Sequence, residues 1–318
     1  MHAAVVESFE RPPRFTEFAE PTAGPGETIV TVRAAALSQL VRTQAAGTHY
    51  SSTTPPWVPG VDGVGVDGDG RRVYFAFPRR PFGAMGERSV VAVSQTTPVP
   101  DGVDDVTASA IGNPGMSSML ALTRRARFTP GESVLVIGAT GASGRLAIQI
   151  ARHLGARRVV AASRQASSEP LLRSLGAEAF VPLALPAAEL SARFRHEIAA
   201  GLDVVLDYVW GPVMEAFFAA AAGSGTGQAA PRLRVVNIGA LGGPTLTLPA
   251  GAMRSSGVEL LGSGIGSATH AEILSATGQM FDAIAPAGLR IETETAPLTQ
   301  VEPAWSRQSS ARLVFTLR

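Results

Sequence analysis

The chain has 318 residues, of which 45% are hydrophobic and 17% are charged, and its formal net charge is +1. That length allows two domains with cores of their own, and the near-neutral charge argues against an extended nucleic-acid surface. The chain contains no cysteine and no lysine, since all 27 basic residues are arginines. Disulfides, thiolate nucleophiles, cysteine-ligated zinc and lysine Schiff bases are therefore excluded.

The N-terminal sequence, MHAAVVESFE, carries acidic residues where a secretory signal needs a longer apolar core. No stretch of the chain approaches the roughly 20 apolar residues of a membrane span. We therefore expect a soluble, cytoplasmic protein that has neither a nucleic-acid partner nor a membrane partner.

The first third of the chain predicts a compact β domain. Short apolar or alternating runs, separated by Gly and Pro turns without helices between them, occur at residues 3–6, 28–34, 72–76 and 89–93. Between these runs, a long loop at residues 44–59 contains His49, Tyr50 and Trp57. A loop of this length without structure of its own is often functional.

The chain is organised around residues 133–155, SVLVIGATGASGRLAIQIARHLG. Residues 134–137 are apolar and largely β-branched, as expected of a strand buried on both faces, and helical periodicity begins after the glycines. A strand, a glycine-rich turn and a helix in this order bind pyrophosphate, because glycine lets the backbone approach and the helix N–H groups face the anion. The stretch therefore predicts a dinucleotide site formed by Thr140, Gly141, Ala142, Ser143 and Gly144.

The end of the next predicted strand, residues 158–162, bears on which dinucleotide binds. Ser163 and Arg164 stand where an NAD-binding chain carries an acidic residue for the ribose 2′-hydroxyl. A hydroxyl and a guanidinium instead suit a 2′-phosphate. We therefore expect NADPH to bind far better than NADH.

Strands and helices continue to alternate up to residue 262, which is typical of a doubly wound parallel sheet with helices on both faces. We predict strands at 134–137, 158–162, 179–183, 203–209, 233–238 and 258–262, and helices at 169–175, 187–200 and 213–222. Ligands should lie at the carboxyl ends of the strands, beside Tyr208, Ile238, Gly239, Ser263, Gly264 and Ile265.

The two junctions of this α/β region are also readable. Residues 106–122 have a helical pattern, and Gly112-Asn-Pro-Gly115 predicts a break between two helices. After a helix at 271–285, predicted strands at 291–295 and 312–317 are expected to rejoin the N-terminal β domain. The predicted domains are 1–116 completed by 269–318, and 117–268.

Six motifs occur in order along the chain: VPGVDGVG (58–65), GNPGMSSMLAL (112–122), GESVLVIGATGASG (131–144), LGAEAFVPL (175–183), DVVLDYVWG (203–211) and VVNIGALGG (235–243). At this spacing they resemble the medium-chain dehydrogenase/reductase superfamily, in its zinc-free quinone oxidoreductase branch. The resemblance covers nearly the whole chain. It implies a Rossmann domain inserted into a GroES-like β-barrel domain, NADPH as cofactor, and a cleft between the two domains.

The chain departs from the zinc-dependent members of this superfamily, which hold catalytic metal with a cysteine and the histidine of a GHE motif. Here Ser38 lies near the cysteine position, where related reductases carry an asparagine, and Gly60-Val-Asp62 replaces GHE. A zinc site needs three or four converging ligands. We therefore expect no metal, and we interpret Asp62 as a turn residue and His49 as an exposed loop residue.

The resemblance also implies site residues outside the glycine-rich turn. Tyr50 lies where related reductases carry a tyrosine beside the nicotinamide, and its phenol could hydrogen-bond a carbonyl oxygen. The alternative for Tyr50 is packing against Trp57. Asn113 and Ser117 are implied as cofactor residues, and the alternative for the Asn-Pro pair is a simple helix break.

The leading interpretation is a zinc-independent, NADPH-dependent reductase of quinones or other α,β-unsaturated carbonyls that acts by direct hydride transfer. One alternative is an enoyl-thioester reductase, in which Arg79-Arg80 or Arg124-Arg125 would bind the phosphate arm. An alternative of another class is a non-catalytic NADPH-binding redox sensor or structural protein. A homodimer is expected from the resemblance, and because the apolar strand at 258–262 would be a sheet edge that needs a partner.

Overall fold

The structure is a computed structural model that describes residues 1–49, 51–223, 230–307 and 309–317. The chain forms two compact units: Met1–Asn113 with Thr277–Arg318, here called the β unit, and Pro114–Ala276, the parallel-sheet unit. It leaves the β unit inside α2 (Asp105–Leu120), three residues before the predicted boundary at 116/117, and returns inside α8 (His270–Ala287), eight residues after the predicted boundary at 268/269.

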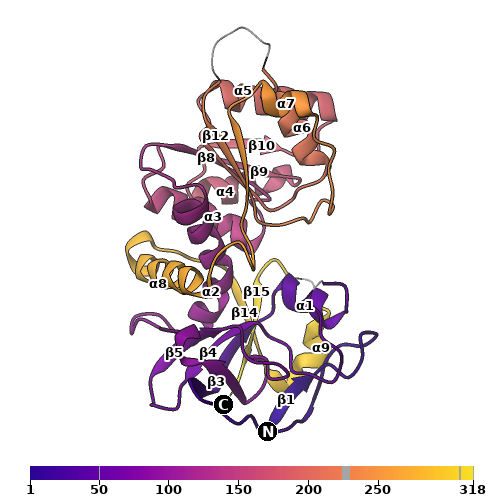
Figure 1. The fold of residues 1–318 in the computed structure, drawn as a ribbon, viewed down its shortest axis with the longest axis vertical. Coiled ribbons are helices and arrows are strands. Elements are labelled where there is room, and N and C mark those ends of the chain that lie inside the picture. Colours follow the sequence, from indigo (N-terminus) through magenta and orange to yellow (C-terminus); the bar gives the residue numbers. More distant parts are fainter. Residues whose placement is uncertain (50, 224–229, 308, 318) are drawn as a thin grey trace. The chain divides into compact units, whose positions relative to one another are not determined.

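The parallel-sheet unit is built on six parallel strands in the order β10–β9–β8–β11–β12–β13 within the described residues (Figure 1). These strands are β8 (Ser133–Ile137), β9 (Arg158–Ser163), β10 (Ala179–Pro182), β11 (Val204–Asp207), β12 (Leu233–Asn237) and β13 (Val258–Gly262). The helices between them are α3 (Ala142–His153), α4 (Glu169–Ser174), α5 (Ala187–Ala199), α6 (Pro212–Ala221) and α7 (Ala250–Arg254). The strand order reverses between β8 and β11, which is the hallmark of a doubly wound sheet.

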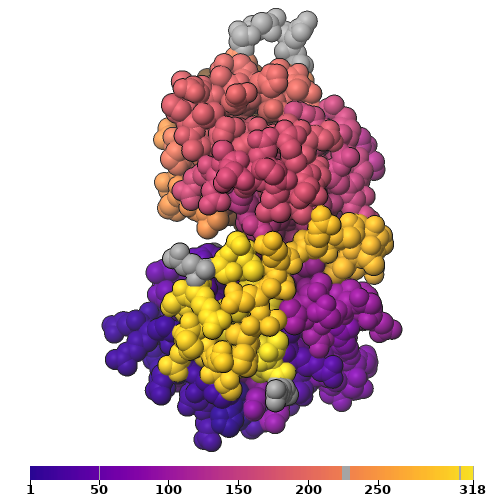
Figure 2. All heavy atoms as spheres, turned by 180° about the vertical axis from the view of Figure 1, so that it is seen from behind, coloured from indigo at the N-terminus to yellow at the C-terminus, as the bar shows by residue number. Residues whose placement is uncertain are grey.

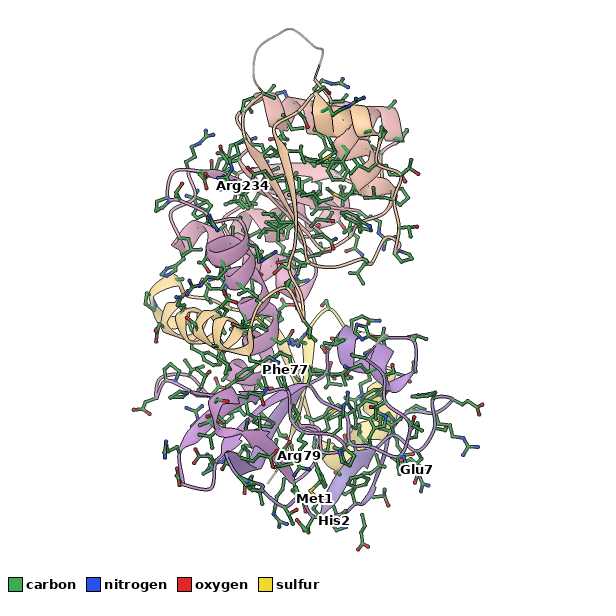
Figure 3. The ribbon with its side chains drawn as sticks, in the orientation of Figure 1. Met1, His2, Glu7, Phe77, Arg79 and Arg234 are labelled. Carbon is green, nitrogen blue, oxygen red and sulfur yellow. The ribbon has the colours of Figure 1, made fainter. Side chains whose placement is uncertain are left out.

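Burial explains why this sheet forms. Every residue of β8 is buried, as the unbroken apolar run predicts for a central strand. On one face, helices α5 and α6 supply Phe194 and Phe217 to a cluster with Leu135 and Val205 of the sheet. A polar exception is Arg234 on β12, which is 2% exposed, donates to the Ala126 carbonyl and pairs with Glu132 (Figure 3).

The β unit is organised around a mostly antiparallel sheet in the order β14–β15–β3–β4–β5–β7, with β6 paired to β3, and around the separate hairpin β1–β2. Its strands are β1 (His2–Val5), β2 (Arg14–Glu17), β3 (Glu27–Ala36), β4 (Asp62–Val66), β5 (Arg72–Ala76), β6 (Arg88–Ala92), β7 (Thr96–Pro98), β14 (Thr293–Pro297) and β15 (Arg312–Thr316). Figure 2 shows the yellow C-terminal residues lying against the indigo and violet N-terminal ones within this unit. The predicted fold class is confirmed: an α/β chain with a parallel sheet and a separate β sheet.

Short elements were the hardest to predict. The region expected to lack helices contains α1 (Gln39–Ala45), which is capped by Ser38 accepting from the Val41 N–H at 3.2 Å. Strands β2, β4 and β7 and helix α9 (Val301–Trp305) were also missed. The described residues also contain three 3₁₀ turns, η1 (Val93–Gln95), η3 (Ala166–Ser168) and η4 (Leu298–Gln300), and one π turn, η2 (Ala121–Arg125).

The predicted break at Gly112-Asn-Pro-Gly115 is wrong, because α2 runs continuously through Pro114. Proline inside a helix removes one hydrogen bond and costs about 3 kcal/mol. The turn before it is fully buried, at Ala110 and Ile111, so tertiary packing outweighs that cost. The Pro114 carbonyl itself accepts from the hydroxyls of Ser117 and Ser118, at 2.9 and 3.2 Å.

A close approach fixes α2 in the β unit. The ring of Tyr74 on β5 packs edge-on against Phe281 of α8, with ring centroids 5.4 Å apart. It also covers Gly112 so closely that a Cβ added there would lie 2.2 Å from the Tyr74 ring. Gly112 is therefore required by packing rather than by a break in the helix.

We expect Gly112→Ala to destabilise the protein by about 1–3 kcal/mol, because the new methyl group must displace the Tyr74 ring. Gly278→Ala in α8 is the matched control, since its Cβ would meet only Thr97, at 3.9 Å. The control should raise stability by about 0.5–1 kcal/mol through helix propensity. Urea unfolding followed by circular dichroism measures both changes, and a Gly112→Ala variant as stable as the parent would contradict this packing argument.

Candidate functional site

The register of the parallel sheet brings the predicted site residues to one edge. At the carboxyl ends of the strands, Ile137 pairs with both Ala162 and Asp207. Asp207 in turn pairs with Asn237, and Asn237 pairs with Gly262. The segments that follow these strands therefore emerge side by side, where open α/β sheets bind their ligands.

The glycine-rich turn after β8 makes a cradle at this edge. A Cβ on Gly144 would lie 2.4 Å from the Gly138 carbonyl oxygen, so the first turn of α3 packs directly against the turn that precedes it. By contrast, the nearest atom to a Cβ on Gly141 would be 3.6 Å away, which leaves space beside this residue. The N–H groups of Gly138 and Ala139, which precede α3, both donate to the Ala162 carbonyl at 3.0 Å. The N–H groups that remain available to an anion are therefore those of the first turn of α3.

At the end of β9 an exposed cation lies beside a buried hydroxyl, that of Ser163, which donates to the Gln165 carbonyl at 3.1 Å. Ser163 is buried, its Oγ lies 2.8 Å from the Ser168 Oγ, and Arg164 beside it is exposed. The first carboxylate further along the chain, Glu169, accepts from Arg173 at 2.8 Å and is thereby engaged within α4. The local charge therefore favours an anionic group rather than a ribose 2′-hydroxyl.

A buried carboxylate holds the middle of the edge together. Asp207 accepts from the N–H groups of Val209 and Trp210, both at 2.9 Å, and from the Asn237 side chain at 3.1 Å. Its carbonyl accepts from the Ile238 N–H at 2.7 Å. Burial raises the pKa of Asp207, and these N–H donors oppose that rise. Asp207 lies within the predicted strand at 203–209, but neither Asp207 nor Asn237 is among the site residues that the sequence predicts.

Tyr208 is present at the edge and belongs to a hydroxyl network that the sequence did not reveal. Its hydroxyl lies 2.8 Å from the Ser118 Oγ, which is also 3.2 Å from the Ser143 carbonyl. Burial raises the pKa of Tyr208, so this phenol stays neutral and can donate. Ser117, a predicted cofactor residue, lies beside the same network: like Ser118 it donates to the Pro114 carbonyl, and hydrogen bonding by both serines opposes the rise of the Tyr208 pKa.

The loop after β13 carries the remaining predicted residues. The N–H of Ser263 donates to the Asn237 carbonyl at 2.8 Å, and the N–H of Gly264 donates to the Ser267 Oγ at 2.7 Å. Ile265 is 49% exposed. Asn113, by contrast, is the last residue of the β unit, half-buried in α2.

In the β unit, the interpretation of Asp62 as a turn residue is wrong. Asp62 opens β4 and is fully buried, and it accepts a hydrogen bond from the Tyr74 hydroxyl at 3.0 Å. Burial raises its pKa to about 6, against the opposing effects of Arg312 and Tyr74. The glycines around Asp62 are typical of turns, and for this reason the sequence did not predict the strand β4 that begins at this residue.

The long loop of the β unit is only partly described. Tyr50 lies outside the described residues, so its predicted role stays a prediction. His49 is half-buried rather than exposed, and its Nδ1 lies 2.7 Å from the Ser51 Oγ. Among residues 1–49, 51–223, 230–307 and 309–317, no three His, Asp or Glu side chains are grouped so as to hold a metal ion. In the same residues, no helix is long and apolar enough to cross a membrane.

Comparison with known proteins places this geometry in context. A family profile described as Zinc-binding dehydrogenase matches residues 142–280. The chain is 28% identical to the probable NADPH-dependent quinone reductase tdiC of Emericella nidulans, over 98% of each sequence. It is 29% identical to the solved quinone oxidoreductase of Thermus thermophilus, described also in its complex with NADPH, with a TM-score of 0.81 over 100% of each chain. A mycobacterial quinone oxidoreductase has a TM-score of 0.86 over 100% of each chain at 22% identity, which concerns the fold alone.

These similarities extend over both units, and they agree with the position of the glycine-rich cradle at the carboxyl edge of the parallel sheet. Over its full length the chain is therefore a quinone oxidoreductase-like protein, similar to reductases of the medium-chain dehydrogenase/reductase type.

Proposed function

We propose that the protein is a zinc-independent, NADPH-dependent reductase of quinones or other α,β-unsaturated carbonyls. The observation that carries this proposal is the edge of the parallel sheet, where a glycine cradle, a hydroxyl–arginine pair and two further strand-end loops meet. The full-length relatives named as NADPH-dependent or NADPH-bound quinone reductases support it.

The residues present suit NADPH. The space beside Gly141 and the N–H groups at the start of α3 suit the pyrophosphate, and Ser163 with Arg164 suits the 2′-phosphate. Tyr208, Gly239 and the Ser263–Ile265 segment would border the rest of the cofactor along the same edge. NADPH supplies the hydride when bound, so the protein needs to contribute only binding, orientation and a donor to the substrate carbonyl.

Two alternatives make different demands on the chain. An enoyl-thioester reductase needs arginines that are available to a phosphate arm, but Arg79 pairs with Glu27 and Arg80 lies over the Trp57 ring. Arg125 is likewise engaged, since it donates to backbone carbonyls, whereas Arg124 is exposed. A non-catalytic NADPH-binding protein would bind NADPH and oxidise none. Assaying NADPH oxidation with a quinone and with an enoyl-CoA ester separates all three functions.

We expect Arg164→Ala to weaken NADPH binding by about 10- to 100-fold, as loss of a charge-assisted hydrogen bond implies, while NADH binding changes little. Arg193→Ala on α5 is the matched control, because it removes another exposed arginine of the same unit away from the edge. Fluorescence titration with both cofactors measures the effect. Equal affinity of the parent protein for NADPH and NADH would refute this assignment of the 2′-phosphate site.

Tyr50 is proposed as the donor to the substrate carbonyl. Loss of one hydrogen bond to developing charge costs about 10²–10³ in kcat, so Tyr50→Phe should strongly slow the reduction of an enone. A quinone needs less acid assistance, and its reduction should slow less. Steady-state rates with both acceptors test this, with an unchanged Kd for NADPH as the control. Parental rates with both acceptors would show that Tyr50 only packs in its loop.

The outer edge of β13 supports the proposal of a homodimer. β13 is the last strand of its sheet, and Leu260 on it is 37% exposed. Sedimentation equilibrium should give about twice the chain mass of 32.9 kDa. Leu260→Lys should weaken this association, whereas Leu171→Lys, at an exposed leucine of α4, should not. A parent protein that sediments as a monomer at micromolar concentration would contradict the proposal.

A further inference from the structure

One arginine outside the loop after β13 holds both ends of that loop. Arg125 donates from Nε to the Gly262 carbonyl at 2.7 Å, and from Nη1 to the Ser267 carbonyl at 3.1 Å. Ser263, Gly264 and Ile265, which we propose to border the cofactor, lie between these two carbonyls. The planar guanidinium presents its donors in a rigid arrangement, so a single side chain spans the whole loop.

Besides Arg125, the loop is held at its start by the buried Ser263, whose N–H donates to the Asn237 carbonyl at 2.8 Å, and further on by a few local hydrogen bonds. Its side chain at Ile265 is 49% exposed, so the loop is not held by burial of that apolar group. Within the loop, Gly264 donates from its N–H to the Ser267 Oγ at 2.7 Å, and Ser267 donates from its N–H to the Gly264 carbonyl at 3.0 Å. A segment held by a few hydrogen bonds near solvent opens easily when one of them is removed.

The element that carries Arg125 is unusual. Arg125 ends the π turn Ala121–Arg125, in which the Ala126 N–H donates to the Ala121 carbonyl at 2.8 Å. π turns are rare and occur often at functional sites. The wider turn changes the direction of Arg125 relative to a continuing α-helix, whereas Arg124 beside it is exposed.

We infer that Arg125 is a positioning residue that holds the loop from Gly262 to Ser267 in the conformation that binds NADPH. This inference rests on the proposed function. Arg125 acts on the backbone of the loop, and it raises the fraction of molecules whose loop is ready to bind. The apparent Kd varies inversely with that fraction, whereas the rate within the bound complex does not depend on it.

Arg125→Ala tests the inference directly. If the binding-competent fraction falls to about one tenth, the Kd and the KM for NADPH rise about tenfold, while kcat with a quinone stays within about twofold. Arg125→Lys should restore part of the affinity, because an ammonium group can reach one of the two carbonyls. Hydrogen exchange in peptides that cover residues 262–268 should become faster in Arg125→Ala and stay unchanged elsewhere.

Arg124→Ala is the matched control, because it removes the same charge from the neighbouring position and should leave the Kd and the exchange rates unchanged. If Arg125→Ala does not fold, Ser267→Ala opens the same loop from within and should raise the KM in the same direction. An unchanged KM in these loop variants, or an equal rise in Arg124→Ala, overturns the inference. A parent protein that fails to bind NADPH refutes instead the proposed function on which the inference rests.

Discussion

The carboxyl edge of the parallel sheet depends on one buried carboxylate. Asp207 ends β11 at 0% exposure, and it is stabilised by N–H groups from the loop that follows it and from Asn237 on the next strand. Removing a carboxylate from water is costly unless donors replace the lost hydration. The loop from Val209 and the end of β12 must therefore keep their positions for the fold to tolerate this charge. The edge is organised before any ligand binds, which lowers the cost of binding one.

The rest of the edge follows from this constraint. Once β11 and β12 are fixed, β8 pairs in parallel with β11 and β13 with β12, so the positions of the carboxyl ends of β8 and β13 are determined as well. The turn after β8 is then closed by the contact of Gly144 with Gly138, for which only glycine is small enough. Two glycines of the same motif thus have different roles: Gly144 allows α3 to pack against the turn, and Gly141 leaves space for a ligand beside the backbone. This division suits a protein that must orient a cofactor and otherwise contributes few side chains to the reaction.

Long periodic segments explain why much of this could be predicted from the sequence. The apolar run of β8 and the helical face of α3 differ in period, and strands and helices continue to alternate up to β13. The parallel sheet and its ligand-binding edge could therefore be predicted from the sequence. The same reasoning failed where a local signal was overridden by burial. Pro114 indicates a helix break, and Asp62 indicates a turn, yet both lie in buried secondary structure. Local propensity is a weak guide once tertiary packing decides.

The supporting residues were missed for a different reason, because their partners are distant in the sequence. Ser118 reaches Tyr208 across 90 residues, and Arg125 reaches Gly262 across 137. Both belong to the helical segment that begins with α2, and each supports a different part of the edge: the β8 and β11 turns in one case, the β13 loop in the other. Their spacing is kept only if the backbone between them is rigid. Pro114 precedes both residues, and because α2 continues through it, the helical backbone from Ser118 to Arg125 is not interrupted by a kink there. The π turn comes after Ser118, so it can change the direction of Arg125 without moving the hydroxyl network of Ser118 and Tyr208.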